Sequence, residues 1–238
     1  MKYFGMLVFL FFGFSAVAQS DFNKTDEKGQ KHGLWKGFYT ESKRPRYEGT
    51  FDHGKEIGTF TFFDDTKAKT VIATRDFGKD NSVYTIFYNQ KKNKVSEGKE
   101  INRLYEGEWK YYHENLPQIM TLEHYKKGKL DGKRTVFYRN ESVAEESNYS
   151  NGLKNGPYKK YTEKGVLLED SNYQNGQFDG PAVYKDPLGN VVAKGNFVNG
   201  KKAGIWEFYE NGKLVSKDNM NKTKGRKKPN KPKVEPKS

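Results

Sequence analysis

The chain has 238 residues, of which 34% are hydrophobic and 31% are charged, and its formal net charge is +13. This apolar share is low for a domain with a deep core, whereas an aromatic share of 15% suits a thin sheet that buries large rings. Because the chain has no cysteine, disulfide frameworks, thiolate nucleophiles, cysteine-bound zinc and iron–sulfur clusters are excluded.

Residues 1–18 have the three parts of a secretory signal peptide. Lys2 supplies the positive start, residues 7–14 are apolar, and Ala16-Val17-Ala18 matches the small-residue cleavage site. The apolar stretch is short for a membrane span of about 20 residues. We therefore expect cleavage after residue 18, followed by a lead-in at residues 19–27, and an exported protein that is periplasmic, envelope-associated or secreted.

One sequence motif recurs at steps of 24 or 25 residues through residues 28–220. It consists of a glycine, three mostly polar residues, a second glycine, and an aromatic-rich segment. Such a fixed period indicates a repeat architecture. Turn signals such as Asn151-Gly152 alternate with two short strands in each unit, so the sequence predicts eight β-hairpins. The second-glycine positions are Gly33, Gly58, Ser82 (as a substitute), Gly107, Gly132, Gly156, Gly180 and Gly204.

Aromatic residues occupy three fixed slots in these units. The first slot, two residues after the second glycine, holds Trp35, Phe60, Tyr84, Trp109, Tyr158 and Trp206, and is interrupted by Arg134 and Ala182. The second slot, five residues after it, holds Phe38, Phe63, Phe87, Tyr112, Phe137, Tyr161 and Tyr209. The closing slot holds Phe51, Phe77, Tyr125, Tyr149, Tyr173 and Phe197. A spacing of three places the first two slots on opposite faces of a regular strand, so either both faces carry rings or a bulge returns the second ring to the first face.

The segments YEGTFDHGKEIGTFTFF from Tyr47 and LYEGEWKYY from Leu104 resemble the MORN (membrane occupation and recognition nexus) repeat. ENGKL from Glu210 is similar to the bacterial branch labelled antitoxin-type. The resemblance covers residues 28–220 and implies an elongated, single-layer antiparallel sheet of about eight hairpins, with roles mostly in scaffolding, protein binding and lipid binding. Strand spacing predicts roughly 10 Å per repeat. Departures from the pattern lie at Ser82, at Arg103 in place of a first glycine, and at Pro181-Ala182.

No catalytic constellation is evident. The motifs of zinc proteases, serine hydrolases and phosphate-binding loops are absent from the sequence. His32 and His53 precede glycines in turns between repeats, where we expect them to be solvated. We therefore expect no enzyme activity, no cofactor and no metal site.

Two features are candidates for partner contact. The aromatic ladders are either the core of the sheet or, on an exposed face, a surface that stacks on glycans or peptide side chains. Residues 221–238 form a Lys/Pro-rich tail with eight basic residues against one acidic residue, which we expect to be disordered. The candidate contact residues are Trp35, Trp109, Arg134, Trp206, Lys224, Arg226, Lys227 and Lys228.

The leading hypothesis is an exported, non-enzymatic repeat scaffold that binds a protein or a cell-envelope component through an extended β surface. One alternative is a binder of anionic lipid or polysaccharide that uses the basic tail and an aromatic ladder. Another is an antitoxin-like protein, by family label only, which the signal peptide argues against. Nucleic acid is not an expected partner of an exported protein.

Overall fold

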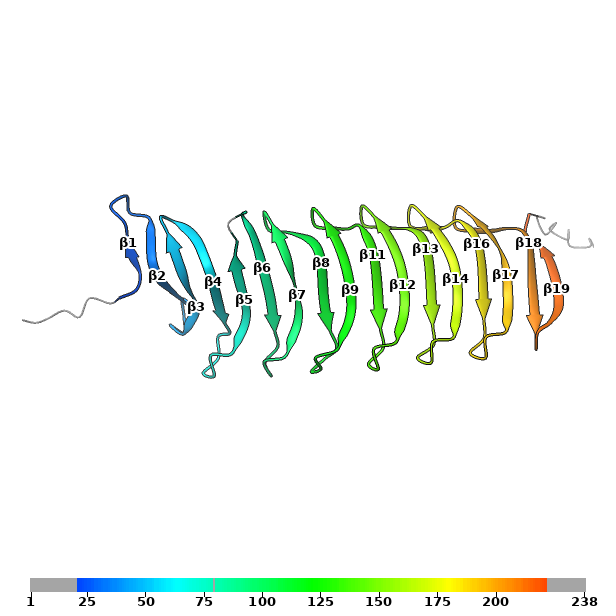
Figure 1. The fold of residues 1–238 in the computed structure, drawn as a ribbon, viewed down its shortest axis with the longest axis horizontal. Coiled ribbons are helices and arrows are strands. Elements are labelled where there is room, and N and C mark those ends of the chain that lie inside the picture. The colour runs from blue at the N-terminus through cyan, green and yellow to red at the C-terminus, as the bar shows by residue number, and fades with distance from the viewer. Residues whose placement is uncertain (1–20, 79, 222–238) are drawn as a thin grey trace, which may run out of the picture.

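The computed structural model describes residues 21–78 and 80–221, which form a long ribbon of antiparallel strands with β1 and β19 at opposite ends (Figure 1). Nineteen strands and no helix occur in these residues, which confirms the all-β class. The predicted signal peptide, and the tail beyond residue 221, lie outside them. The strands are β1 (Lys24–Thr25), β2 (Lys31–Phe38), β3 (Pro45–Asp52), β4 (Lys55–Phe63), β5 (Val71–Phe77), β6 (Ser82–Tyr88), β7 (Lys94–Ile101), β8 (Leu104–Tyr112), β9 (Ile119–Lys126), β10 (Lys129–Leu130), β11 (Gly132–Phe137), β12 (Val143–Ser150), β13 (Leu153–Tyr161), β14 (Leu167–Gln174), β15 (Gln177–Phe178), β16 (Gly180–Lys185), β17 (Val191–Val198), β18 (Lys201–Glu210) and β19 (Lys213–Asn219).

Each repeat is one hairpin, and successive hairpins pair side by side, as predicted. Repeats 1 to 8 are the hairpins β2/β3, β4/β5, β6/β7, β8/β9, β11/β12, β13/β14, β16/β17 and β18/β19. The short strands β10 and β15 pair with β9 and β14 at the turns between repeats. Each repeat therefore contacts mainly its two neighbours, and stability should be nearly additive along the array.

Left-handed residues make the turns between repeats. Asn151 and Gly152 have φ values of 51° and 89°, the combination that a two-residue type I′ turn requires. Asn102 and Arg103 adopt the same conformation, with φ values of 52° and 65°. Arg103 thus takes the geometry of the first glycine although its side chain makes that conformation unfavourable.

The second glycine produces a bulge between neighbouring repeats. At Gly107, with φ 71°, the pairing jumps from Gly98↔Trp109 to Lys99↔Glu106. Repeat 3 lacks this bulge, because the ladder between β5 and β6 runs without a register shift.

The register of repeat 3 corrects our assignment by one residue. Val83, not Ser82, lies 25 residues after Gly58 and opposite the closing slot, so Thr85 takes the first aromatic slot and Tyr88 the second. Thr85 is 1% exposed, whereas Tyr84, which we had placed in that slot, is 43% exposed. The prediction relied on Gly78, Tyr84 and Phe87, which keep the spacing of the repeat around Ser82, whereas the pairing of the strands follows Val83.

Both faces of the sheet carry aromatic rings. The register shift within repeat 4 lies in the returning strand, between Tyr111↔Thr121 and Tyr112↔Ile119, so the outgoing strand alternates regularly. Trp109 and Tyr112 therefore lie on opposite faces, which we call the core face and the back face. On the back face the hydroxyl of Tyr112 donates to Glu97, and that of Tyr161 donates to Glu146 at 3.1 Å.

The core face is built from rings that pack on glycine backbone of the preceding repeat. A Cβ atom on Gly98 would lie 2.3 Å from the ring of Trp109, and one on Gly195 would lie 2.3 Å from that of Trp206. We call each such contact, including Gly49 with Phe60, a ring-on-glycine step. Close approach of this kind excludes water, and both tryptophans are fully buried in a sheet only one layer thick.

Candidate binding groove

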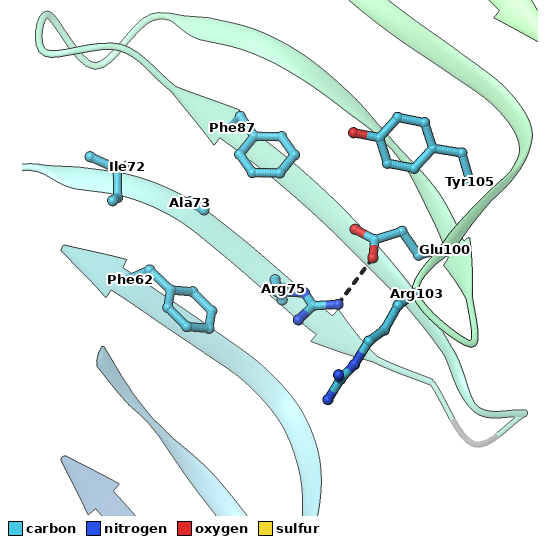
Figure 2. Close-up of a pocket in the computed structure, with 8 residues that line it drawn as sticks. All are labelled: Phe62, Ile72, Ala73, Arg75, Phe87, Glu100, Arg103 and Tyr105. Atoms are coloured by element: carbon cyan, nitrogen blue, oxygen red, sulfur yellow. Dashed lines mark hydrogen bonds and ion pairs between the residues drawn. The ribbon is translucent and has the colours of Figure 1, made fainter. Parts of the chain in front are cut away.

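The core face is open at repeat 3, where two rings of the repeating pattern are missing. Thr85 stands in the first aromatic slot, and Glu100, opposite Val83, stands in the closing slot. Arg75 lies opposite Thr85 in place of the glycine of a ring-on-glycine step. The result is a groove of about 580 Å³, lined by Phe62, Ile72, Ala73, Arg75, Phe87, Glu100, Arg103 and Tyr105 (Figure 2).

Apolar side chains form the walls of this groove. Phe62 on β4 and Phe87 on β6 both pair with Ala73 on β5, whose small side chain leaves the space between them (Figure 2). Ile72 is the extra residue at the bulge between Phe62 and Phe63. Phe87 remains 36% exposed, so an apolar group in the groove would cover a ring that the protein itself leaves in water.

The floor is polar and contains an unsatisfied donor. Arg75 Nη2 lies 3.2 Å from Glu100 Oε2, and Thr85 Oγ1 donates to Glu100 Oε1 at 2.7 Å. Arg75 Nε is buried without a hydrogen-bond partner among the described residues. A buried unpaired donor costs about 1–3 kcal/mol, so this floor is less favourable than the packed rings of the other repeats.

Arg103 adds a second cation at the mouth of the groove. It comes from the turn after β7 and extends on the same side of the sheet as Arg75 (Figure 2). Within residues 21–78 and 80–221, no carboxylate lies within ion-pair distance of its guanidinium group. Apolar walls beside two guanidinium groups suit an apolar or aromatic group that is linked to a carboxylate or another anion.

The three predicted tryptophan contacts lie in the core or near the end of the sheet, outside this groove. Trp109 and Trp206 are 0% exposed, and their indole nitrogens donate to the carbonyl oxygens of Lys99 (2.9 Å) and Asn196 (3.0 Å). These two residues are core and cannot touch a partner. Trp35 is half-buried, and its indole nitrogen donates to the carbonyl oxygen of Lys24 at 2.9 Å. The predicted tail contacts Lys224, Arg226, Lys227 and Lys228 lie outside the described residues.

Arg134 replaces a ring of the core face instead of projecting toward a partner. Its guanidinium group lies 2.9 Å from Glu123 and 3.3 Å from Glu145, and only 26% of its side chain is exposed. Two of its three guanidinium nitrogens, Nε and Nη1, are therefore already bonded to carboxylates of the protein.

The residues that line the groove were missed by the sequence prediction, although two signals for it were present. The closing slot has no aromatic residue in repeat 3, and Arg103 replaces a first glycine. The one-residue error at Ser82 concealed their meaning, because it placed Tyr84 in the slot that Thr85 occupies.

One described group has the donors for a metal ion: His32, Asp52 and His53, at the turn between repeats 1 and 2. Asp26 accepts a hydrogen bond from His53, which raises the pKa of that imidazole and lowers the pKa of the Asp26 carboxyl group. This turn is separate from the residues that line the groove.

Among the described residues, no helix is long and apolar enough to cross a bilayer.

Comparisons with known proteins identify the repeat. A family model described as a MORN repeat variant matches residues 130–151, 154–175 and 204–222. No curated protein matches the chain. One similar solved structure is that of a point mutant of S. aureus TarM in complex with fondaparinux, alpha-GlcNAc-glycerol and UDP. It is 13% identical, with a TM-score of 0.22, over 51% of this chain and 19% of that chain, a likeness too low to carry an argument. The three matched repeats confirm the predicted resemblance to the MORN repeat, and the same hairpin order continues through the rest of the array.

Proposed function

We propose that this protein is an exported, non-enzymatic scaffold that binds a partner protein of the cell envelope, and that the groove at repeat 3 is its contact site. MORN repeats in general are scaffolds that bind proteins or membranes, which supports a binding role. The observation that carries the proposal is the groove itself, which opens where Thr85 and Glu100 replace two rings.

The chemistry of the groove favours a peptide segment as ligand. Its volume of about 580 Å³ lies in the range of ordinary ligand sites. An apolar side chain would fill the space between Phe62 and Phe87, while a carboxylate would meet Arg103. A partner segment with an apolar residue next to an acidic residue or a chain terminus has both features.

A capture experiment with paired variants tests this proposal. The immobilised protein is incubated with the envelope fraction of the native cells, and the retained proteins are compared for Phe87→Ser, Tyr84→Ser and the unchanged chain. Phe87 is exposed on the core face within the groove, and Tyr84 is an exposed ring on the back face of the same strand. Phe87→Ser should lose the partner and Tyr84→Ser should retain it. Equal retention by all three proteins would contradict the groove as the contact site.

A vesicle-binding experiment distinguishes an anionic-lipid partner from a protein partner. Vesicles with and without anionic lipid are tested against the full chain and a variant that lacks residues 221–238. Salt-sensitive vesicle binding that requires the tail and is unaffected by Phe87→Ser would favour the anionic-lipid hypothesis over a protein partner.

A further inference from the structure

The turn between repeats 1 and 2 brings together two imidazoles and a carboxylate that are distant in sequence. His32 lies in β2, Asp52 ends β3, and His53 follows it with φ 44°. Asp52 Oδ1 lies 3.6 Å from His32 Nδ1 and 3.8 Å from His53 Nε2, and all three donor atoms lie within 4.8 Å of one another.

Asp26 orients His53 from behind. Its Oδ2 lies 2.6 Å from His53 Nδ1, and its Oδ1 accepts hydrogen bonds from the backbone amides of Lys28 (2.9 Å) and Gln30 (2.8 Å). Only 9% of the Asp26 side chain is exposed. When His53 Nδ1–H donates to this carboxylate, the lone pair of Nε2 faces Asp52. A carboxylate that holds a histidine in this way is the usual outer partner of a zinc ligand.

The equivalent turns of other repeats use simpler contacts. Asp131 and Asp179 occupy the position of His32 and accept hydrogen bonds from the backbone amides of Asn151 and Asn199, both at 3.0 Å. In the first turn the corresponding contact, from the His53 amide to His32 Nδ1, is 3.5 Å, close to the 3.4 Å between the Asn175 amide and Asn155 Oδ1. The first turn differs from these in residue type, because its two positions hold imidazoles that can also bind a metal ion.

We propose that His32 Nδ1, Asp52 Oδ1 and His53 Nε2 bind one divalent transition-metal ion of the zinc class, with water as a further ligand. Bonds of about 2.0–2.2 Å in a tetrahedral site place neighbouring ligand atoms roughly 3.3 Å apart, so two of the three separations need little change. All three side chains are exposed and can make that adjustment. Two imidazole donors select zinc-like ions over Ca²⁺ and Mg²⁺, which prefer oxygen.

Such an ion would fasten the end of the array. Asp26 and β1 precede the first hairpin, and β1 pairs with β2 through Lys24↔His32 and Thr25↔Lys31. An ion held by residues of β2, of β3 and of the following turn, with Asp26 bonded to one of its ligands, would tie the lead-in to repeats 1 and 2. Terminal repeats contact only one neighbour, so they gain most from an added link.

Isothermal titration of Zn²⁺ into the full chain, purified without a polyhistidine tag, tests the site. One ion per chain is expected, with little or no binding of Ca²⁺. His53→Gln and His32→Gln should each weaken binding at least tenfold, and Asp26→Asn should weaken it by about 10–100-fold. His124→Gln is the matched control, because the His124 side chain hydrogen-bonds to the carbonyl oxygen of Lys133, away from the first turn, and the change should leave binding unchanged.

Thermal unfolding without metal checks that the variants are folded. Zn²⁺ should raise the melting temperature of the unchanged chain and of His124→Gln, but not that of a His32→Gln/His53→Gln double variant. The proposal is overturned if the unchanged chain binds Zn²⁺ no more tightly than the double variant, or if His124→Gln weakens binding to the same extent.

Discussion

Repeats 3 and 4 are neighbours in one sheet, yet one leaves the core face open and the other closes it. In repeat 4, Trp109 packs on Gly98, stacks on Tyr105 at 3.7 Å between ring centroids, and is fully buried. In repeat 3 the corresponding slot holds Thr85, which hydrogen-bonds to Glu100 and pairs with Arg75 across the strands. The hairpins pair in the same order on both sides, so the side chains in the slots, not the path of the strands, decide whether a groove forms.

Two other interrupted slots show what else is needed. Arg134 fills its slot with a long side chain and pairs with two carboxylates. Ala182 leaves a gap in repeat 7, but Phe178 packs there and stacks on Phe197 at 4.8 Å between centroids. The groove therefore depends on the loss of two rings in one repeat without a replacement.

The largest difference in stability should appear when the side chain in the first aromatic slot of each repeat is replaced by alanine. Trp109→Ala should destabilise the array by about 3–5 kcal/mol, because a fully buried ring leaves a cavity. Thr85→Ala should cost about 1 kcal/mol, the value of its hydrogen bond to Glu100. Chemical denaturation monitored by circular dichroism measures both losses. Similar losses for the two variants would contradict the distinction between a closed and an open repeat.

Replacing the glycine that packs against the ring of Trp109 should also destabilise the array. Gly98→Ala should cost about 1–3 kcal/mol, because the new methyl group would meet the ring of Trp109 at 2.3 Å. Ser147→Ala is the control, since Ser147 takes the same position under Tyr158 and its buried hydroxyl has no partner among the described residues. That change should be neutral in the same denaturation assay, and a loss equal to that of Gly98→Ala would argue against ring-on-glycine packing.

At the mouth of the groove, stability and binding should move in opposite directions. Arg103→Gly should raise the free energy of unfolding by about 1 kcal/mol, because the left-handed conformation at φ 65° suits glycine. The same change should weaken capture of the partner, since it removes a cation from the groove. Arg139→Gly, at an exposed turn residue outside the left-handed region, should give no such gain.

The smallest effect concerns the back face of repeat 8, where charges pair across the strands. Hydrogen bonds from Lys217 and then from Tyr209 and Lys194 lower the pKa of Glu207 from 4.5 to about 2. Because the pKa is lower in the folded state, this contribution is present above about pH 4.5 and is lost as the pH falls toward 2. Melting curves between pH 5 and pH 2 should therefore fall less steeply for Glu207→Gln than for the unchanged chain. Parallel curves would show that these bonds do not contribute in solution.

The sequence predicted the periodic features well, because local chemistry determines them. Asn-Gly pairs such as Asn151-Gly152 specify tight turns, and the slots of Trp109 and Trp206 follow from the period. The irregular register of repeat 3 was not predictable in the same way, because Ser82 lies within one residue of the position where a second glycine is expected. Only the strand pairing shows that this repeat has no bulge.

The two sites were harder to predict because they depend on pairing between strands. Arg75 and Glu100 are 25 residues apart and meet only through the register of β5, β6 and β7. In the sequence, His32 and His53 are separate turn residues. The pairing of the first hairpin places their ring centroids 4.7 Å apart.

The central claim, that missing rings create the binding site, is tested most directly by restoring them. The triple variant Arg75→Gly/Thr85→Phe/Glu100→Tyr gives repeat 3 the glycine and the two rings of the other repeats and fills the groove. All three residues are replaced together so that no charge is left buried without its partner. Quantitative capture from the envelope fraction should show that the triple variant loses the partner while its melting temperature is unchanged or higher. Undiminished capture by a folded triple variant would contradict the claim.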